Sequence, residues 1–258
     1  MKIGAQLYTV RQFTQTEADF DKTINRIANM GYTCVQISGI GDIPVDKVKS
    51  ICDNYKIEII LSHTNPNRLL NDIDNVIREH KIMNANYIGI GGLPFEYHNG
   101  LQGLNQFIVD YTSISRKIKK SKMKFMYHNH QYDFVEFDGK LVIDRIAEGF
   151  SEDLLGFTLD TYWVQAGGGD PAYYIKKFSG RVDTIHFKDM KILQNPDGSL
   201  IQIMAEVLDG NLNWQSIFEE SKKAGVKYAF VEQDDEYVKD PFECLKLSYN
   251  NLLSQGYN

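Results

Sequence analysis

The segment KFMYHNHQYD, residues 124–133, shows the pattern that decides the fold of this chain. A short run of residues suited to a β-strand ends abruptly in polar side chains, among them His128 and His130. Runs of the same kind recur at regular intervals and are typical of buried strands. We expect eight strands: Ile3–Leu7, Cys34–Ile37, Glu58–Ser62, Tyr87–Ile90, Lys124–His128, Gly156–Asp160, Thr184–Phe187 and Tyr228–Glu232.

Between the expected strands lie segments whose apolar residues are three and four positions apart, the spacing of amphipathic helices. One such stripe comprises Phe20, Ile24 and Ile27. Regular alternation of strands and helices predicts a parallel sheet with right-handed crossovers. Eight such units in 258 residues match a (β/α)₈ barrel, so we predict a single TIM-barrel domain over residues 1–258. A doubly wound sheet would place a glycine-rich loop after the first strand, where Leu7-Tyr-Thr-Val-Arg11 stands instead.

Composition limits the classes of function. The net charge of −6 offers no general cationic surface, so we expect no nucleic-acid partner. No apolar run approaches the ~20 residues that span a bilayer, so we expect no membrane partner. The three cysteines are far apart and read as free thiols. The first residues are predicted to form a strand rather than a signal peptide, so we expect a cytoplasmic protein. Whether the chain forms homo-oligomers is left open.

Polar residues gather at the C-terminal ends of the expected strands, where TIM barrels carry their active sites. Four of the six histidines lie there: His63, His128, His130 and His186. The other polar residues at these ends are Gln6, Tyr8, Gln36, Asp160, Lys188, Asp189, Glu232, Gln233 and Asp234. Random placement on a surface would not collect histidine in this way. The mouth of the barrel is therefore the candidate site.

Asp160, His186 and Glu232 end strands six, seven and eight of the expected barrel. Two carboxylates and an imidazole that converge at one place suit Mn²⁺, Co²⁺, Fe²⁺ or Zn²⁺. Strand five can supply a fourth ligand, because His128 and His130 are two positions apart and so share one side of an extended chain. Which of the two histidines binds the metal stays open.

Five motifs in order along the chain resemble those of the xylose-isomerase-like TIM barrels: Gln6-Leu-Tyr-Thr-Val-Arg11, His128-Asn-His130, Leu159-Asp-Thr-Tyr-Trp163, Ile185-His-Phe-Lys-Asp189 and Val231-Glu-Gln-Asp234. This family includes sugar phosphate isomerases and epimerases, with inosose dehydratase and D-tagatose 3-epimerase among the relatives. The resemblance implies one divalent metal ion, commonly Mn²⁺, held by four side chains on strands five to eight. Asp160, His186 and Glu232 match three of these positions.

The strand-five ligand is where the sequence departs from the family pattern. Relatives typically carry a glutamate there, and aligning His130 with their following histidine places His128 at the glutamate position. Glu136, slightly further along, is another candidate if its loop folds back. We take His128 as the expected ligand, with His130 and Glu136 as alternatives.

The resemblance implies a metal-dependent isomerase or epimerase that acts on a ketose, keto-sugar or related polyol through an enediolate-type intermediate. The epimerases use two metal-bound carboxylates on opposite faces of the substrate, and only Glu232 is in place here. A dehydratase or lyase of the inosose or 3-keto-glycoside type is therefore the alternative. We expect acid–base roles for Glu232, His130 and Lys188, and substrate contacts from Gln6, Tyr8, His63 and Trp163.

Two further functions on the same fold rank lower. An endonuclease IV-like repair enzyme needs several metal ions and a basic groove, and the net charge of −6 counts against it. A metal-free sugar-binding barrel that has lost its activity is the other. Metal analysis of the purified protein distinguishes all of these functions.

Overall fold

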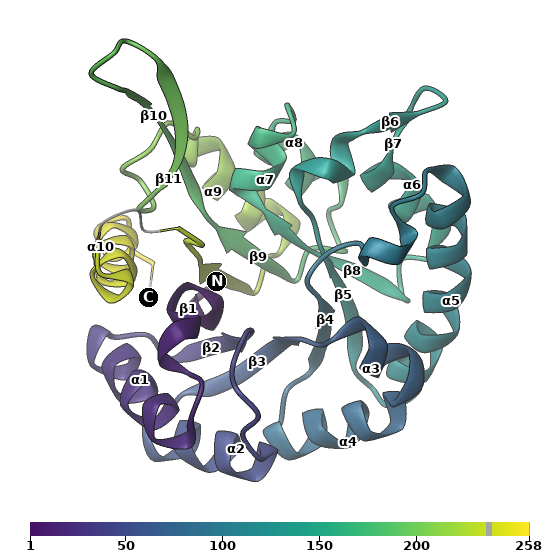
Figure 1. Cartoon of the computed structure of the whole chain (residues 1–258), viewed down its shortest axis with the longest axis horizontal. Coiled ribbons are helices and arrows are strands. Elements are labelled where there is room, and N and C mark those ends of the chain that lie inside the picture. The colour runs from purple at the N-terminus through teal and green to yellow at the C-terminus, as the bar shows by residue number, and fades with distance from the viewer. Residues whose placement is uncertain (236–238, 258) are drawn as a thin grey trace.

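The computed structural model describes residues 1–235 and 239–257. Its centre is a closed barrel of eight parallel strands in the order β1-β12-β9-β8-β5-β4-β3-β2, surrounded by helices (Figure 1). The predicted TIM barrel is therefore confirmed, and no predicted strand end is displaced by more than one residue. The strands are β1 Lys2–Gln6, β2 Cys34–Ile37, β3 Glu58–His63, β4 Tyr87–Ile90, β5 Lys124–His128, β8 Leu155–Asp160, β9 Thr184–Phe187 and β12 Tyr228–Val231.

The outer layer consists of helices whose apolar faces pack on the barrel. In α1 the predicted stripe is buried, and the helix ends at Gly31, whose φ of 108° favours glycine. Gly225 ends α9 in the same way, at a φ of 76°. The α-helices are α1 Glu17–Met30, α2 Val45–Asn54, α3 Pro66–Asn71, α4 Ile73–Met83, α5 Leu101–Lys120, α6 Val142–Gly149, α7 Thr161–Ala166, α8 Pro171–Lys177, α9 Trp214–Ala224 and α10 Pro241–Ser254, and the 3₁₀ turns are η1 Leu7–Phe13, η2 Phe95–Tyr97 and η3 Gln131–Phe134.

The barrel interior changes from apolar to polar along the strands. A small cluster drawn from β2, β3, β4, β5 and β12 fills the interior toward its N-terminal end. Because side chains on one face of a strand repeat every second residue, the next interior positions lie one layer nearer the mouth. The chain places polar groups at those positions. In this way Cys34 is followed by Gln36, Met126 by His128 and Phe230 by Glu232.

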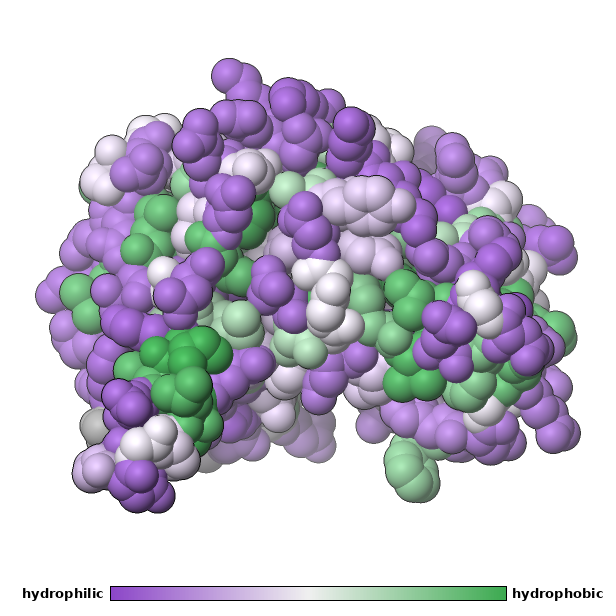
Figure 2. Space-filling model, turned by 90° about the horizontal axis from the view of Figure 1, so that it is seen from above, coloured by the Kyte–Doolittle hydropathy of each residue, from purple (hydrophilic) through white to green (hydrophobic). Residues whose placement is uncertain are grey.

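Two hairpins extend beyond the barrel (Figure 1). One is formed by β10 Asp189–Gln194 and β11 Leu200–Ala205. The sequence Asn195-Pro-Asp-Gly198, which joins these strands, is a strong turn signal and predicts a hairpin at this place. Ile192, Leu193, Leu200 and Ile201 of this hairpin are exposed, and Figure 2 shows hydrophobic side chains on the arm at the lower left, the side where the hairpin lies. The other hairpin pairs β6 Glu136–Phe137 with β7 Lys140–Leu141. Among the described helices, none combines the length and the apolar character that crossing a bilayer requires.

Candidate metal centre

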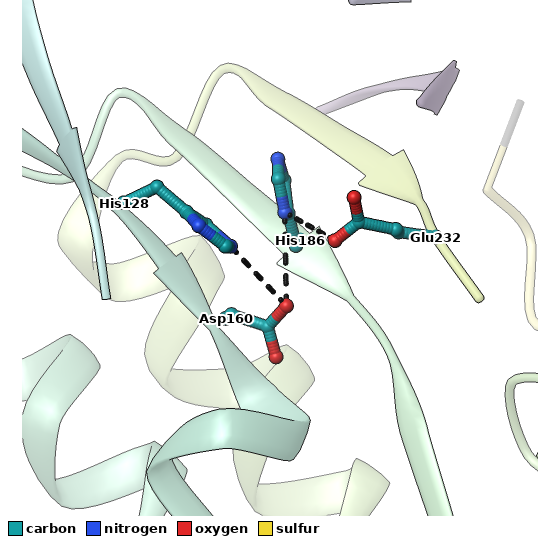
Figure 3. Close-up of side chains that lie close together, drawn as sticks. All are labelled: His128, Asp160, His186 and Glu232. Atoms are coloured by element: carbon teal, nitrogen blue, oxygen red, sulfur yellow. Dashed lines mark hydrogen bonds and ion pairs between the residues drawn. The ribbon is translucent and has the colours of Figure 1, made fainter. Parts of the chain in front are cut away.

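Four side chains of metal-binding type converge at the C-terminal mouth of the barrel. They are His128 at the end of β5, Asp160 at the end of β8, His186 on β9 and Glu232 just after β12. One potential ligand atom from each lies within 4.8 Å of the others, and all four residues are buried. Figure 3 shows them pointing toward one another from β5, β8, β9 and the position just after β12. The structure thus brings together the four residues expected to bind the metal.

Hydrogen bonds outside the cluster fix how Asp160 and His128 face it. Asp160 Oδ1 caps α7 by accepting a hydrogen bond from Trp163 N at 2.9 Å, which leaves Oδ2 directed into the cluster. Nδ1 of His128 donates to the carbonyl oxygen of Gly91 at 3.3 Å. The other ring nitrogen, Nε2, faces Asp160 Oδ2 at 3.4 Å.

His186 is held in a corresponding way. Its Nε2 donates to Oε1 of Gln36 at 2.8 Å. Its Nδ1 lies 2.8 Å from Oε2 of Glu232 and 3.7 Å from Oδ2 of Asp160, yet no hydrogen bond in the described structure satisfies it. Each imidazole therefore turns a ring nitrogen toward carboxylate oxygens, an arrangement that either a proton or a bound metal ion can bridge. This donor set fits a divalent metal ion.

The charge around the cluster also fits a divalent ion. Lys188 is fully buried beside it, with Nζ at 3.3 Å from Glu232 Oε2 and 3.5 Å from Asp160 Oδ2, and it also pairs with Asp234. Three carboxylates and one ammonium leave two negative charges uncompensated. The donor set of two imidazoles and two carboxylates suits Mn²⁺, Fe²⁺, Co²⁺ and Zn²⁺ alike.

Burial and neighbouring charges act in opposite directions on the pKa values of these groups. Burial raises the pKa of Glu232, but the positive charges of Lys188 and His186 outweigh it and hold the pKa well below its usual value. Burial lowers the pKa of His186, but the carboxylates of Glu232 and Asp160 raise it to about 9. In the metal-free protein at neutral pH, a proton on His186 therefore supplies part of the positive charge that a bound metal ion would supply.

A cavity of about 630 Å³ opens beside the cluster. Glu232, Asp234, His128 and His130 form one wall, and loops after β2, β3 and β4 form the other. Among the described residues that line the cavity there is no lysine or arginine. The polar groups are hydroxyls, imidazoles, an amide and carboxylates, which are suited to hydrogen-bond the hydroxyl groups of a small molecule.

The structure separates the four residues expected to contact the substrate into two pairs. Tyr8 and His63 line the cavity, and Nε2 of His63 has no partner in the described structure. Gln6 and Trp163 do not line it. Gln6 is fully buried, and its Oε1 accepts a hydrogen bond from the backbone N of Tyr8 at 3.3 Å. The ring of Trp163 packs against the ring of His130, with centroids 5.2 Å apart.

Of the three alternatives for the strand-five ligand, only His128 belongs to the cluster. His130 lies on the cavity wall, and its Nδ1 is 3.2 Å from the hydroxyl oxygen of Tyr132. Burial and the neighbouring His128 lower the pKa of His130 to about 3, so its ring is neutral and suited to hydrogen bonding. Glu136 is exposed on the β6–β7 hairpin, and the loop does not fold back toward the cluster.

Two residues that contact the cluster or its buried lysine were given no role in the predictions from sequence. Gln36 contacts a member of the cluster, and Asp234 pairs with Lys188 and lines the cavity. The available signal for Gln36 is an amide inside the buried strand CVQI. For Asp234 it is a second acidic residue shortly after β12, but which of several neighbouring acids faces inward depends on the local chain path.

Comparison with known proteins agrees with this geometry. Residues 24–247 match the family model described as xylose isomerase-like TIM barrel. The chain belongs to this family. None of the curated protein sequences matches the chain.

Several solved structures superpose over nearly the whole chain. A sugar phosphate isomerase/epimerase from Parabacteroides distasonis is 22% identical with a TM-score of 0.79, covering 97% of this chain and 93% of its own. The probable 3-DHS dehydratase AsbF from Bacillus anthracis is 13% identical with a TM-score of 0.73, covering 98% and 99%. An L-ribulose 3-epimerase is 12% identical with a TM-score of 0.72, covering 99% and 94%. At these identities the likeness shows the fold.

Proposed function

We propose that this xylose isomerase-like barrel is a divalent-metal-dependent sugar isomerase or epimerase, with Mn²⁺ as the expected ion. Its substrate would be a ketose, keto-sugar or related polyol that reacts through an enediolate-type intermediate. The observation that carries the proposal is the buried cluster of His128, Asp160, His186 and Glu232, which meets a polar cavity at the mouth of the barrel. Solved relatives that bear isomerase and epimerase names support the choice of reaction class.

The bound metal ion would polarise a carbonyl or hydroxyl oxygen of the substrate and lower the energy of an enediolate. Glu232 is ionised and lines the cavity, so its carboxylate is the group placed to remove a proton from substrate carbon. Lys188 keeps Glu232 ionised from a distance of 3.3 Å. His130, with its neutral ring, and His63, with an unpartnered Nε2, are placed to hold substrate hydroxyl groups.

A dehydratase or lyase is the second candidate, and the position of the acids favours it. Only one carboxylate of the cluster, that of Glu232, lines the cavity. Asp160 is fully buried and does not line the cavity. His128 occupies the wall where a second carboxylate would stand in a symmetric epimerase. Proton removal on one face, followed by loss of a β-hydroxyl or β-alkoxyl group, needs only one strong base. A dehydratase among the structural relatives is consistent with this route.

The nuclease and the inactive barrel are less well supported. Within residues 1–235 and 239–257 there is a single cluster of metal-binding type, whereas an endonuclease IV-like enzyme requires several metal ions. The cavity wall in the same residues carries carboxylates rather than cations, which disfavours a phosphodiester backbone. Four buried, mutually facing ligand groups are costly to retain without a cation, which disfavours a metal-free barrel.

Proton exchange in heavy water tests the proposal. The Mn²⁺-loaded protein is incubated in D₂O with ketoses, inososes and 3-keto-glycosides, and products are followed by mass spectrometry and NMR. We expect metal-dependent incorporation of deuterium at the carbon next to the carbonyl. A labelled sugar of unchanged composition identifies isomerisation or epimerisation, and loss of water or of the aglycone identifies the lyase. Equal exchange with the metal-free protein would contradict the proposal.

A further inference from the structure

Gln36 makes a contact that crosses the barrel. It lies on β2, is fully buried, and its Oε1 lies 2.8 Å from Nε2 of His186 on β9. Because β2 and β9 are separated by β1 and β12 in the barrel, this contact spans the interior and is not part of strand pairing. Outside the cluster itself, Gln36 is the one hydrogen-bond partner described for the ring of His186.

The chemistry of the two groups determines where the ring proton lies. An amide oxygen only accepts hydrogen bonds, so Nε2 of His186 must carry a hydrogen. In the neutral ring the lone pair then resides on Nδ1, which faces the carboxylates of Glu232 and Asp160. The opposite tautomer would turn an N–H toward the centre of the cluster and could not bind a cation there.

We propose that Gln36 is a positioning residue that holds His186 in the orientation and tautomer in which Nδ1 can bind the metal ion. This inference rests on the proposed metal dependence and adds a residue that acts through a ligand. In many metal sites a carboxylate or backbone carbonyl orients the ligating histidine. Here an amide does so, and it orients the ring without adding a further negative charge next to Asp160, Glu232 and Asp234.

The neighbouring strand provides a matched control. Gln6 on β1 is directly paired in register with Gln36, is the same residue type and is equally buried. Its Oε1 bonds to the backbone N of Tyr8 and not to a ligand group. Replacing either glutamine by leucine removes a buried amide from the same layer of the barrel, but only Gln36→Leu leaves Nε2 of His186 without an acceptor.

The test is the Mn²⁺ dissociation constant of the wild type, Gln36→Leu, Gln36→Glu and Gln6→Leu. We expect Gln36→Leu to weaken binding about 10–100-fold, as is typical for loss of such a partner. Gln36→Glu restores an acceptor and should recover the affinity, and Gln6→Leu should bind like the wild type. Thermal unfolding of each metal-free variant checks that it is folded. Wild-type affinity in Gln36→Leu, or an equal loss in Gln6→Leu, would overturn the inference.

If Gln36→Leu does not fold, the position of the ring hydrogen of His186 in the unmodified protein provides a second test. In the diamagnetic Zn²⁺-loaded protein labelled with ¹⁵N, we expect the His186 ring to carry its hydrogen on Nε2. A hydrogen on Nδ1 would overturn the inference. Failure of the wild type to bind any metal would instead refute the proposed function itself, so the two failures are distinguishable.

Discussion

Asp160 serves both the fold and the site with a single carboxylate. Oδ1 caps α7 through the backbone N of Trp163, and Oδ2 faces His128 and His186. The backbone N of Asp160 in turn donates to Oδ1 of Asn129 at 2.9 Å, which ties the ends of β5 and β8 together. The candidate ligand is therefore fixed by the start of a helix rather than by a flexible loop.

We predict that Asp160→Asn and Glu232→Gln lose metal binding while the protein stays folded. Asparagine retains the oxygen that caps α7, so the helix should persist. Each change removes one of two negative charges that compensate a divalent ion, and we expect at least about a 100-fold loss of affinity. Metal titration and circular dichroism measure the two effects. Asp170→Asn, which changes the cap of α8 away from the cluster, is the control and should bind as the wild type does.

We also predict that metal affinity rises with pH. The carboxylates of Glu232 and Asp160 overcome the effect of burial and raise the pKa of His186 from 6.5 to about 9. The metal must displace this proton, so affinity should rise about tenfold per pH unit between these values. The proton stabilises the metal-free fold fully below pH 6.5, and that stability is lost as the pH rises through about 9. Metal titration across this range tests the prediction, and a pH-independent affinity would contradict it.

At the residue scale, Asp160, His186 and Glu232 were predictable as ligands because strand ends in a parallel barrel meet at one mouth. The fourth ligand was not fixed by the sequence, since the choice among His128, His130 and Glu136 depends on the path of the chain after β5. Nor could sequence reasoning find the partner of His186, because Gln36 reaches across the interior from a strand that is not a neighbour.

At the scale of elements, Asp189 anchors the long segment after β9. Its carboxylate accepts hydrogen bonds from the backbone N of Leu208, Gly210 and Leu212 and from Nε1 of Trp214. One side chain at the base of the β10–β11 hairpin thus holds much of the segment that follows the hairpin. The turn at residues 195–198 predicted the hairpin, but its anchor was not predicted, because three of these four donors are backbone groups that any sequence provides.

We predict that Asp189→Ala destabilises the protein by about 2–4 kcal/mol, because several buried donors lose their acceptor together. Urea unfolding measures the change, and limited proteolysis should show faster cleavage between residues 189 and 213. Asp209→Ala in the same segment removes only an exposed ion pair with Lys191, 3.2 Å long, and should cost less than about 1 kcal/mol. Equal effects of the two changes would contradict the anchoring role.

At the scale of the whole molecule, the order of strands and helices was predictable because each β-rich run is followed by a helical stripe. Eight such units leave few other topologies once crossovers are right-handed. What the pattern could not give is the reaction, since the same barrel carries relatives named as epimerase and dehydratase. The reaction depends on a few atoms at the mouth.

The molecule as a whole should be stabilised by the metal it is proposed to bind. A ligand that binds only the folded state raises the free energy of unfolding, by about 2.7 kcal/mol at a concentration 100 times the dissociation constant. We therefore predict that Mn²⁺ raises the melting temperature of the wild type and leaves that of Glu232→Gln unchanged. Differential scanning calorimetry with and without the ion measures this. A similar rise in both proteins would indicate binding elsewhere.

Calorimetric titration of the metal-free protein with Mn²⁺ tests the proposed metal centre most directly. We predict one saturable site per chain, because one cluster of four ligand groups is present in the described residues. Absence of binding, or a stoichiometry of several ions per chain, would contradict this prediction.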